Sequence, residues 1–179
     1  MVFGGRGAAV ALTSLALAVS TAAWTPAGHA DGGRQRGLVC TGESDSVYDP
    51  PLTLSARETS VHTEARYACT VAPGRTVPAT GVLDAVTADA SCITLTSTHA
   101  TETVRYGDGH RSVILYDQGT TTRVVGALNV ILSGRVTQGR GQGLSARRSV
   151  AARPGQLPTE CLSSGLRGST GGAQLEIQP

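Results

Sequence analysis

The segment from Thr59 to Val71 alternates between two kinds of side chain along its whole length. Its odd positions are small, apolar or cysteine: Thr59, Val61, Thr63, Ala65, Tyr67, Cys69 and Val71. Its even positions are mostly polar or charged. A period of two places the two sets on opposite faces of a β-strand, whereas a helix would scatter the apolar set around its circumference. The segment therefore predicts a strand with one buried face and one face in water.

The pattern of strands continues along the rest of the chain. Strands are predicted at Val82–Leu95, Thr101–Tyr106, Arg111–Tyr116, Thr120–Ser133, Leu144–Ala152 (the weakest) and Ala173–Ile177. Turns are predicted at 107–109 (Gly-Asp-Gly) and at 117–119, because glycine and aspartate tolerate positive φ. Residues 153–172 are expected to form a loop, and no helix of useful length is expected after residue 30. Short strands joined by glycine turns predict an all-β antiparallel fold, either an immunoglobulin-like sandwich or a closed barrel.

The first thirty residues have the layout of a secretory signal peptide. Arg6 precedes an apolar run from Ala8 to Val19, and small residues lead to Gly28-His29-Ala30. The run is shorter than the roughly 20 residues that a membrane-spanning helix needs. We therefore expect a helical signal segment over 1–30, a flexible start over 31–37, and one secreted β domain over 38–179 with no membrane span.

Four cysteines in an exported domain predict two disulfides, for which three pairings are possible. We favour Cys40–Cys69 and Cys92–Cys161, because sequential pairing needs the fewest chain crossings. Such bridges would each stabilise the fold by roughly 3.5 to 4.5 kcal/mol through loop closure. A zinc site is the alternative use of the cysteines, but the chain has no C-x-x-C pair.

The composition argues against several functions. The formal net charge is only +2, with arginine but no lysine, so there is no electrostatic case for nucleic acid or an anionic membrane as partner. Outside the signal segment the aromatic residues are Tyr48, Tyr67, Tyr106 and Tyr116, too few for a stacking surface that binds sugars or single-stranded nucleic acid. We expect no cofactor and no metal.

The sequence has no nucleophile motif such as G-x-S-x-G and no H-E-x-x-H. Three pairs of polar residues are candidate acid–base groups: His62 with Glu64, His99 with Glu102, and Asp108 with His110. Each pair is interpreted as ordinary solvated strand or turn residues, and the protein is expected not to be an enzyme. A Ser–His–Asp site assembled in space from one of these histidines is the alternative.

Two arginine-bearing segments suggest other roles. Arg75 lies between Pro73 and Pro78, shortly after Cys69, where a rigid loop could inhibit a trypsin-like protease. The plainer interpretation is a turn with a solvated arginine. Arg147 and Arg148 are interpreted as an exposed strand end or a site of proteolytic nicking.

Two resemblances support this picture. The run Ala65-Arg66-Tyr67-Ala68-Cys69 resembles the A-x-Y-x-C segment of immunoglobulin domains, although no tryptophan lies between Cys40 and Cys69. More broadly, Cys40-Thr41-Gly42-Glu43, the run 134–141 (GRVTQGRG) and the late Cys161 resemble small secreted proteins of actinomycetes. That resemblance implies an all-β domain with two disulfides and brings no assigned activity or site.

The sequence therefore predicts a non-catalytic extracellular β domain that binds a partner or serves in the cell envelope. The partner is not identified by the sequence, and an extracellular protein is one option. Inhibition of a trypsin-like protease through Arg75 is the main alternative. A barrel that encloses a small apolar ligand is a further one, which a filled interior would exclude.

Overall fold

The structure is a computed structural model that describes residues 37–95, 99–124, 127–152 and 157–179. The predicted signal peptide (1–30) and all but the last residue of the flexible start (31–37) lie outside this range. The elements are β1 (Leu38–Leu52), β2 (Arg57–Ala72), β3 (Arg75–Ala90), β4 (Ala100–Tyr106), β5 (Arg111–Val124), β6 (Ala127–Gly139), β7 (Ser145–Ala152), α1 (Leu157–Leu162) and β8 (Leu166–Gln178).

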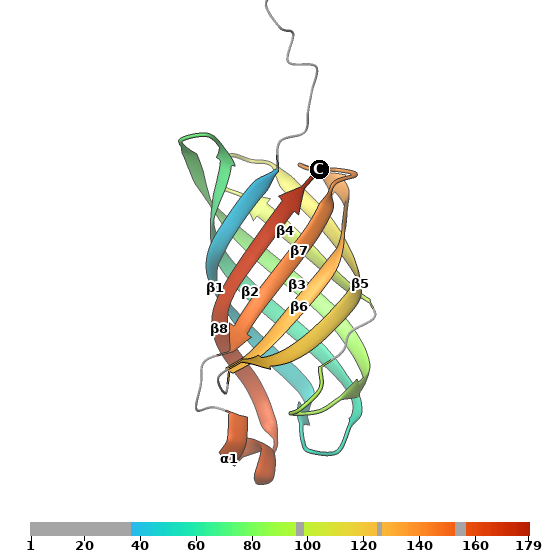
Figure 1. Cartoon of the computed structure of the whole chain (residues 1–179). Helices are drawn as coiled ribbons and strands as arrows, with labels where there is room; N and C mark the ends of the chain where they lie inside the picture. The colour runs from blue at the N-terminus through green and yellow to red at the C-terminus, as the bar shows by residue number, and fades with distance from the viewer. Residues whose placement is uncertain (1–36, 96–98, 125–126, 153–156) are drawn as a thin grey trace, which may run out of the picture. The chain divides into compact units, whose positions relative to one another are not determined.

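The eight strands form one closed antiparallel barrel in which each strand pairs with the next along the chain (Figure 1). The barrel closes where β1 pairs with β8, from Leu38 opposite Ile177 to Leu52 opposite Leu166. Closure leaves no free edge in the sheet that the eight described strands form. Of the two predicted architectures, the barrel is therefore the one that the chain adopts.

The alternation on β2 is confirmed residue by residue. Every odd position from Thr59 to Cys69 is buried inside the barrel, and every even position from Ser60 to Thr70 is exposed. The period of two thus separates the interior from the outer surface, as expected for a strand with one wet face.

Several predicted boundaries are wrong. The predicted turn at 117–119 is continuous strand within β5, and the register of β5 against β6 shifts between Tyr116 and Gln118. The chain reverses instead between Val124 and Ala127, which pair with each other. A bulge can hold glycine and polar residues inside a strand, so these residues alone do not prove a turn.

The predicted loop over 153–172 is also wrong in part. It contains the six-residue helix α1, and β8 begins at Leu166, well before the predicted Ala173. Residues 168–172 have the sequence Gly-Ser-Thr-Gly-Gly, which is unusual for a strand. A Cβ at Gly171 would lie 2.4 Å from the carbonyl oxygen of Ala151, so this close approach of β7 to β8 requires glycine.

Both predicted disulfides are confirmed, Cys40–Cys69 and Cys92–Cys161. The first joins directly paired positions of β1 and β2 inside the barrel. The second joins the segment after β3 to α1 at one end of the barrel, which we call the helix end. The opposite end holds the C-terminus (Figure 1). Among the described residues, no helix is long and apolar enough to cross a membrane.

Two apolar clusters make up the core of the barrel. The larger contains Tyr67, Tyr106 and Tyr116, and the smaller, which includes Cys92 and Cys161, lies toward the helix end. Ala85 and Val130 pack against both clusters. The boundary between the two clusters is where the site described next is found.

Candidate functional site: an internal cavity beside a buried ion pair

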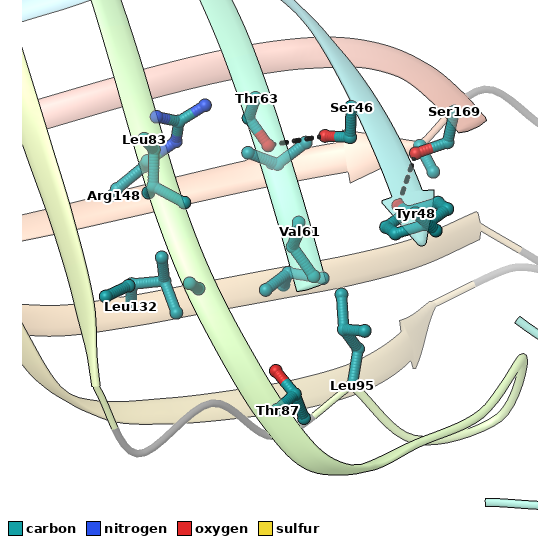
Figure 2. Close-up of a pocket in the computed structure, with 15 residues that line it drawn as sticks. Ser46, Tyr48, Val61, Thr63, Leu83, Thr87, Leu95, Leu132, Arg148 and Ser169 are labelled. Carbon is teal, nitrogen blue, oxygen red and sulfur yellow. Dashed lines mark hydrogen bonds between the residues drawn. The ribbon is translucent and has the colours of Figure 1, made fainter. Parts of the chain in front are cut away.

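A cavity of about 60 Å³ lies inside the barrel where the two apolar clusters meet (Figure 2). It is lined by Ser46, Tyr48, Val61, Thr63, Leu83, Ala85, Thr87, Leu95, Ala100, Val130, Leu132, Arg148, Val150, Ala152 and Ser169. A water needs about 10–15 Å³ of such volume, so the cavity is large enough for several waters or a small organic molecule.

The cavity exists because several inward positions carry small side chains. Ala85, Ala100 and Ala152 occupy inward positions of β3, β4 and β7, where a larger residue would fill the space. Ala85, Val130 and Val150 face the interior yet are only partly buried. The interior is therefore not packed to completion at this level of the barrel.

Most polar groups of the wall are paired with each other. Ser46 and Thr63 are hydrogen-bonded through their hydroxyls at 2.8 Å, and Tyr48 and Ser169 at 2.7 Å. Burial raises the pKa of Tyr48, so its hydroxyl stays protonated at neutral pH. Because these hydroxyls are satisfied, this part of the wall presents a mainly apolar surface.

Leu95 lies at the edge of the cavity and is fixed by contacts with β5. The Thr121 hydroxyl donates to the carbonyl oxygen of Leu95 at 2.8 Å and accepts from its backbone N–H at 3.3 Å. The Cys92–Cys161 disulfide holds the same segment three residues earlier. Two independent anchors thus position this side chain against the cavity.

A buried ion pair adjoins the cavity. Arg148 Nη1 donates to Glu102 Oε1 at 2.7 Å, and both side chains are almost fully buried, at 1% and 0% exposure. Tyr67 donates to Oε1 at 3.0 Å and Tyr116 donates to Oε2 at 2.6 Å. Glu102 therefore accepts three hydrogen bonds, the arrangement that a buried carboxylate requires.

The surroundings fix the protonation of these groups. Burial raises the pKa of Tyr67 and Tyr116, and the charge of Glu102 raises both pKa values further. Burial lowers the pKa of Arg148 and is the largest single cause, but Glu102, Tyr67 and Tyr116 together outweigh it and the net shift is upward. The tyrosines therefore remain donors and the arginine remains charged at all physiological pH values.

Gly81 makes room for this network. A Cβ at that position of β3 would lie 2.6 Å from Glu102 Oε1 and 2.9 Å from a ring carbon of Tyr67. A side chain at this position would force the Glu102 carboxylate or the Tyr67 ring to move.

Two polar atoms of cavity-lining residues make no hydrogen bond to any other residue that the structure describes. They are Arg148 Nη2 and Thr87 Oγ1. Both residues are 1% exposed. Figure 2 places them on different sides of the cavity, with Leu132 and Val61 between them. The cavity wall is thus mainly apolar, and two of its lining residues, Arg148 on one side and Thr87 on the other, each carry a buried polar atom without a partner among the described residues.

The predicted candidates lie elsewhere. Arg75 is the first residue of β3, at the end opposite α1, where its side chain is 62% exposed. Its Nη2 lies 3.5 Å from Asp108 Oδ2, and Arg140 Nη2 donates to the same oxygen at 2.7 Å. Asp108 also contacts His110 Nδ1, at 3.3 Å. Arg75 therefore belongs to a cluster of ion pairs between turns.

The histidine pairs are on the outer surface. His62 Nδ1 is 2.7 Å from Asp84 Oδ1, a partner that sequence reasoning did not name, and its Nε2 is 4.0 Å from Glu64. His99 is exposed, whereas Glu102 points into the barrel, so the interpretation of Glu102 as an ordinary solvated strand residue is wrong. No group of three or more His, Cys, Asp or Glu in the described part of the chain is arranged to hold a metal ion.

The prediction for Arg147 and Arg148 is half wrong. Arg147 is exposed, but Arg148 is buried and central to the site. The burial of Arg148 could have been predicted from the sequence, because Ala146, Arg148 and Ala152 share one face of an alternating strand.

Fold and site together define a closed eight-stranded antiparallel barrel with an internal, mainly apolar cavity next to a buried ion pair. The chain matches no protein-family model and no curated protein sequence.

Proposed function

We propose that this protein is an exported, non-catalytic binding domain that takes a small, mainly apolar molecule into the cavity of its barrel. The observation that carries the proposal is the cavity itself, which is lined by aliphatic side chains inside an otherwise packed interior. Apolar enclosure with a few polar groups is the usual character of a small-molecule site.

Two features of the fold suit this role. The wall is built on paired strands, which hold the side chains in fixed positions, and the Cys92–Cys161 bridge secures the segment that carries Leu95. A site prepared in this way loses little conformational entropy when a ligand binds. The two disulfides also fit an oxidising compartment, which supports export.

The cavity volume limits the ligand. An engineered cavity of about 150 Å³ in another protein holds benzene. A cavity of about 60 Å³ would therefore take a molecule, or the end of a molecule, of only a few heavy atoms. Affinities near the millimolar range are expected for ligands of this size.

The test is titration of the protein with 2-butanone and 2-methylbut-1-ene, followed by NMR of the valine and leucine methyl groups. We expect at least one of the two to shift the methyl signals of Val61, Leu83 and Leu132. Ala85→Val should weaken binding at least tenfold, because the added methyl groups occupy the cavity. Ala68→Val is the matched control, since Ala68 is exposed on β2, and it should leave binding unchanged.

Absence of binding by both compounds, or equal binding by the two alanine variants, would refute the proposal. Protease inhibition through Arg75 remains a separate prediction, which a trypsin titration would test.

A further inference from the structure

Arg148 has a terminal nitrogen whose hydrogen-bond donors no described residue uses. Its Nη1 is bound by Glu102, while its Nη2 lacks an acceptor among the described residues and belongs to a side chain that lines the cavity. A buried donor without an acceptor is unfavourable, and more so when it carries charge. An acceptor that enters the cavity would remove this cost.

The charge of the site decides what kind of acceptor is suitable. Glu102 lies within 2.7 Å of Arg148 and cancels its charge, so the pair as a whole is neutral. Tyr67 and Tyr116 add donors to Glu102 but no charge at neutral pH. A ligand carboxylate would place a second negative charge near Glu102 inside the barrel, where Arg148 would be the cation shared by both.

A neutral oxygen avoids that repulsion. A carbonyl oxygen accepts a hydrogen bond from Nη2 and brings no net charge, while an attached aliphatic group can contact Val61, Leu83 and Leu132. The paired hydroxyls of the wall, Ser46 with Thr63 and Tyr48 with Ser169, leave Arg148 as the strongest donor for such an oxygen.

We propose that the ligand of this cavity is a small neutral molecule whose carbonyl oxygen accepts a hydrogen bond from Arg148 Nη2 and whose aliphatic part occupies the remaining space. The proposal rests on the function proposed above and adds the chemical class of the ligand. It makes Arg148 a residue with two roles, one in the ion pair and one in recognition.

The experiment compares three molecules of nearly the same shape: 2-butanone, its alkene counterpart 2-methylbut-1-ene, and propanoate. A purely apolar cavity would favour the alkene, because the ketone gives up its hydrogen bonds with water on entry. We expect the ketone to bind at least as tightly as the alkene, and propanoate to bind at least tenfold more weakly than the ketone at pH 7.

The results separate this inference from the function on which it rests. If neither neutral molecule binds, the proposed function fails. If the alkene binds more tightly than the ketone, the cavity is a binding site but the role of Arg148 is refuted. Tighter binding of propanoate than of the ketone would refute the requirement for a neutral ligand.

A substitution tests whether Arg148 is the residue that recognises the carbonyl oxygen. Arg148→Lys keeps a cation beside Glu102 but removes the second arm of the guanidinium. We expect its affinity for 2-butanone to fall at least tenfold and its affinity for the alkene to change less than twofold. Equal weakening of both would show that the substitution acts on the cavity as a whole and would overturn the assignment. If this variant does not fold, the comparison of the three molecules on the unmodified protein still decides.

Discussion

Glu102 and Arg148 place two full charges in the interior of a small barrel, and the cost of removing them from water is high. The pair persists because each charge has close partners. Glu102 accepts from Arg148, Tyr67 and Tyr116 at 2.6–3.0 Å, so its carboxylate is fully used. This arrangement also explains why position 81 is a glycine, since Glu102 and Tyr67 occupy the space that a side chain there would need.

The energetic coupling of the pair can be measured in a double-mutant cycle. Arg148→Met alone should lower the free energy of unfolding by about 3–5 kcal/mol, because it leaves a buried, uncompensated carboxylate. The double variant Arg148→Met with Glu102→Gln should lose clearly less than the sum of the two single losses. Urea denaturation of the four proteins gives these values, and strictly additive losses would mean that the two charges do not depend on each other.

The sequence alone predicts one member of this ion pair but not the other. Alternation along Ala146, Arg148 and Ala152 places Arg148 on the inward face, so its burial could have been inferred. Its partner could not, because Glu102 is 46 residues away and meets it across the barrel interior. Adjacent residues on one strand are related by sequence period, whereas contacts across a barrel depend on shear and closure.

The hairpin between β4 and β5 shows how a turn is joined to other elements of the barrel. The predicted hairpin at 107–109 is confirmed between β4 and β5, with Gly109 at a φ of +86° and its N–H donating to the Tyr106 carbonyl oxygen. The sequence predicts Asp108 to be an ordinary solvated turn residue. Its carboxylate in fact accepts from Arg140, whose guanidinium lies 4.7 Å from the centre of the Tyr106 ring. The hairpin is thereby tied to the segment between β6 and β7.

This ion pair makes stability depend on pH. The hydrogen bond from Arg140 lowers the pKa of Asp108 from 3.8 to about 2. Because the folded pKa is the lower one, the stabilisation is complete above about pH 4 and is lost as the pH falls toward 2. Asp108→Asn should therefore melt below the unmodified protein at pH 7, and the difference should shrink as the pH approaches 2. A melting difference that grows on acidification would contradict this assignment.

The predicted strands succeed where alternation is strict and fail where glycine interrupts it. β2 follows its pattern from Thr59 to Cys69, but the glycines at the start of β8 lead to the prediction of a loop there. Gly171 is there to let β7 and β8 approach closely, which is a property of the neighbouring strand. The local composition of β8 therefore cannot show that a glycine is needed at this position.

At the scale of the whole molecule, the decisive contact is the pairing of β1 with β8. Neighbouring strands along the chain pair in order around the barrel, and this last pairing joins the beginning of the fold to its end. Both a sandwich and a barrel have strands with one buried face, so alternation could not distinguish them. The interior cavity follows from closure as well, because its lining comes from seven of the eight strands and the segment that carries Leu95.

The two disulfides cross-link this barrel in different ways, and their removal should separate stability from binding. Cys40–Cys69 closes a separation of 29 residues between strands that are already paired, and Cys92–Cys161 closes one of 69 residues at the helix end. Loop-closure entropy predicts a contribution of about 3.5 kcal/mol for the first and about 4.5 kcal/mol for the second. Replacing each pair by alanines is a matched comparison, since all four sulfurs belong to buried residues.

Loss of Cys92–Cys161 should therefore cost more stability, and it should also weaken the binding of 2-butanone, because it frees the segment that holds Leu95 against the cavity. Loss of Cys40–Cys69 should lower stability but leave binding nearly unchanged, since neither cysteine lines the cavity. Urea denaturation and NMR titration of the two variants measure both effects. The opposite order of stabilities would mean that local packing, not chain entropy, governs the contribution of each bridge. Equal binding by both variants would mean that Thr121 alone is sufficient to hold Leu95 in place.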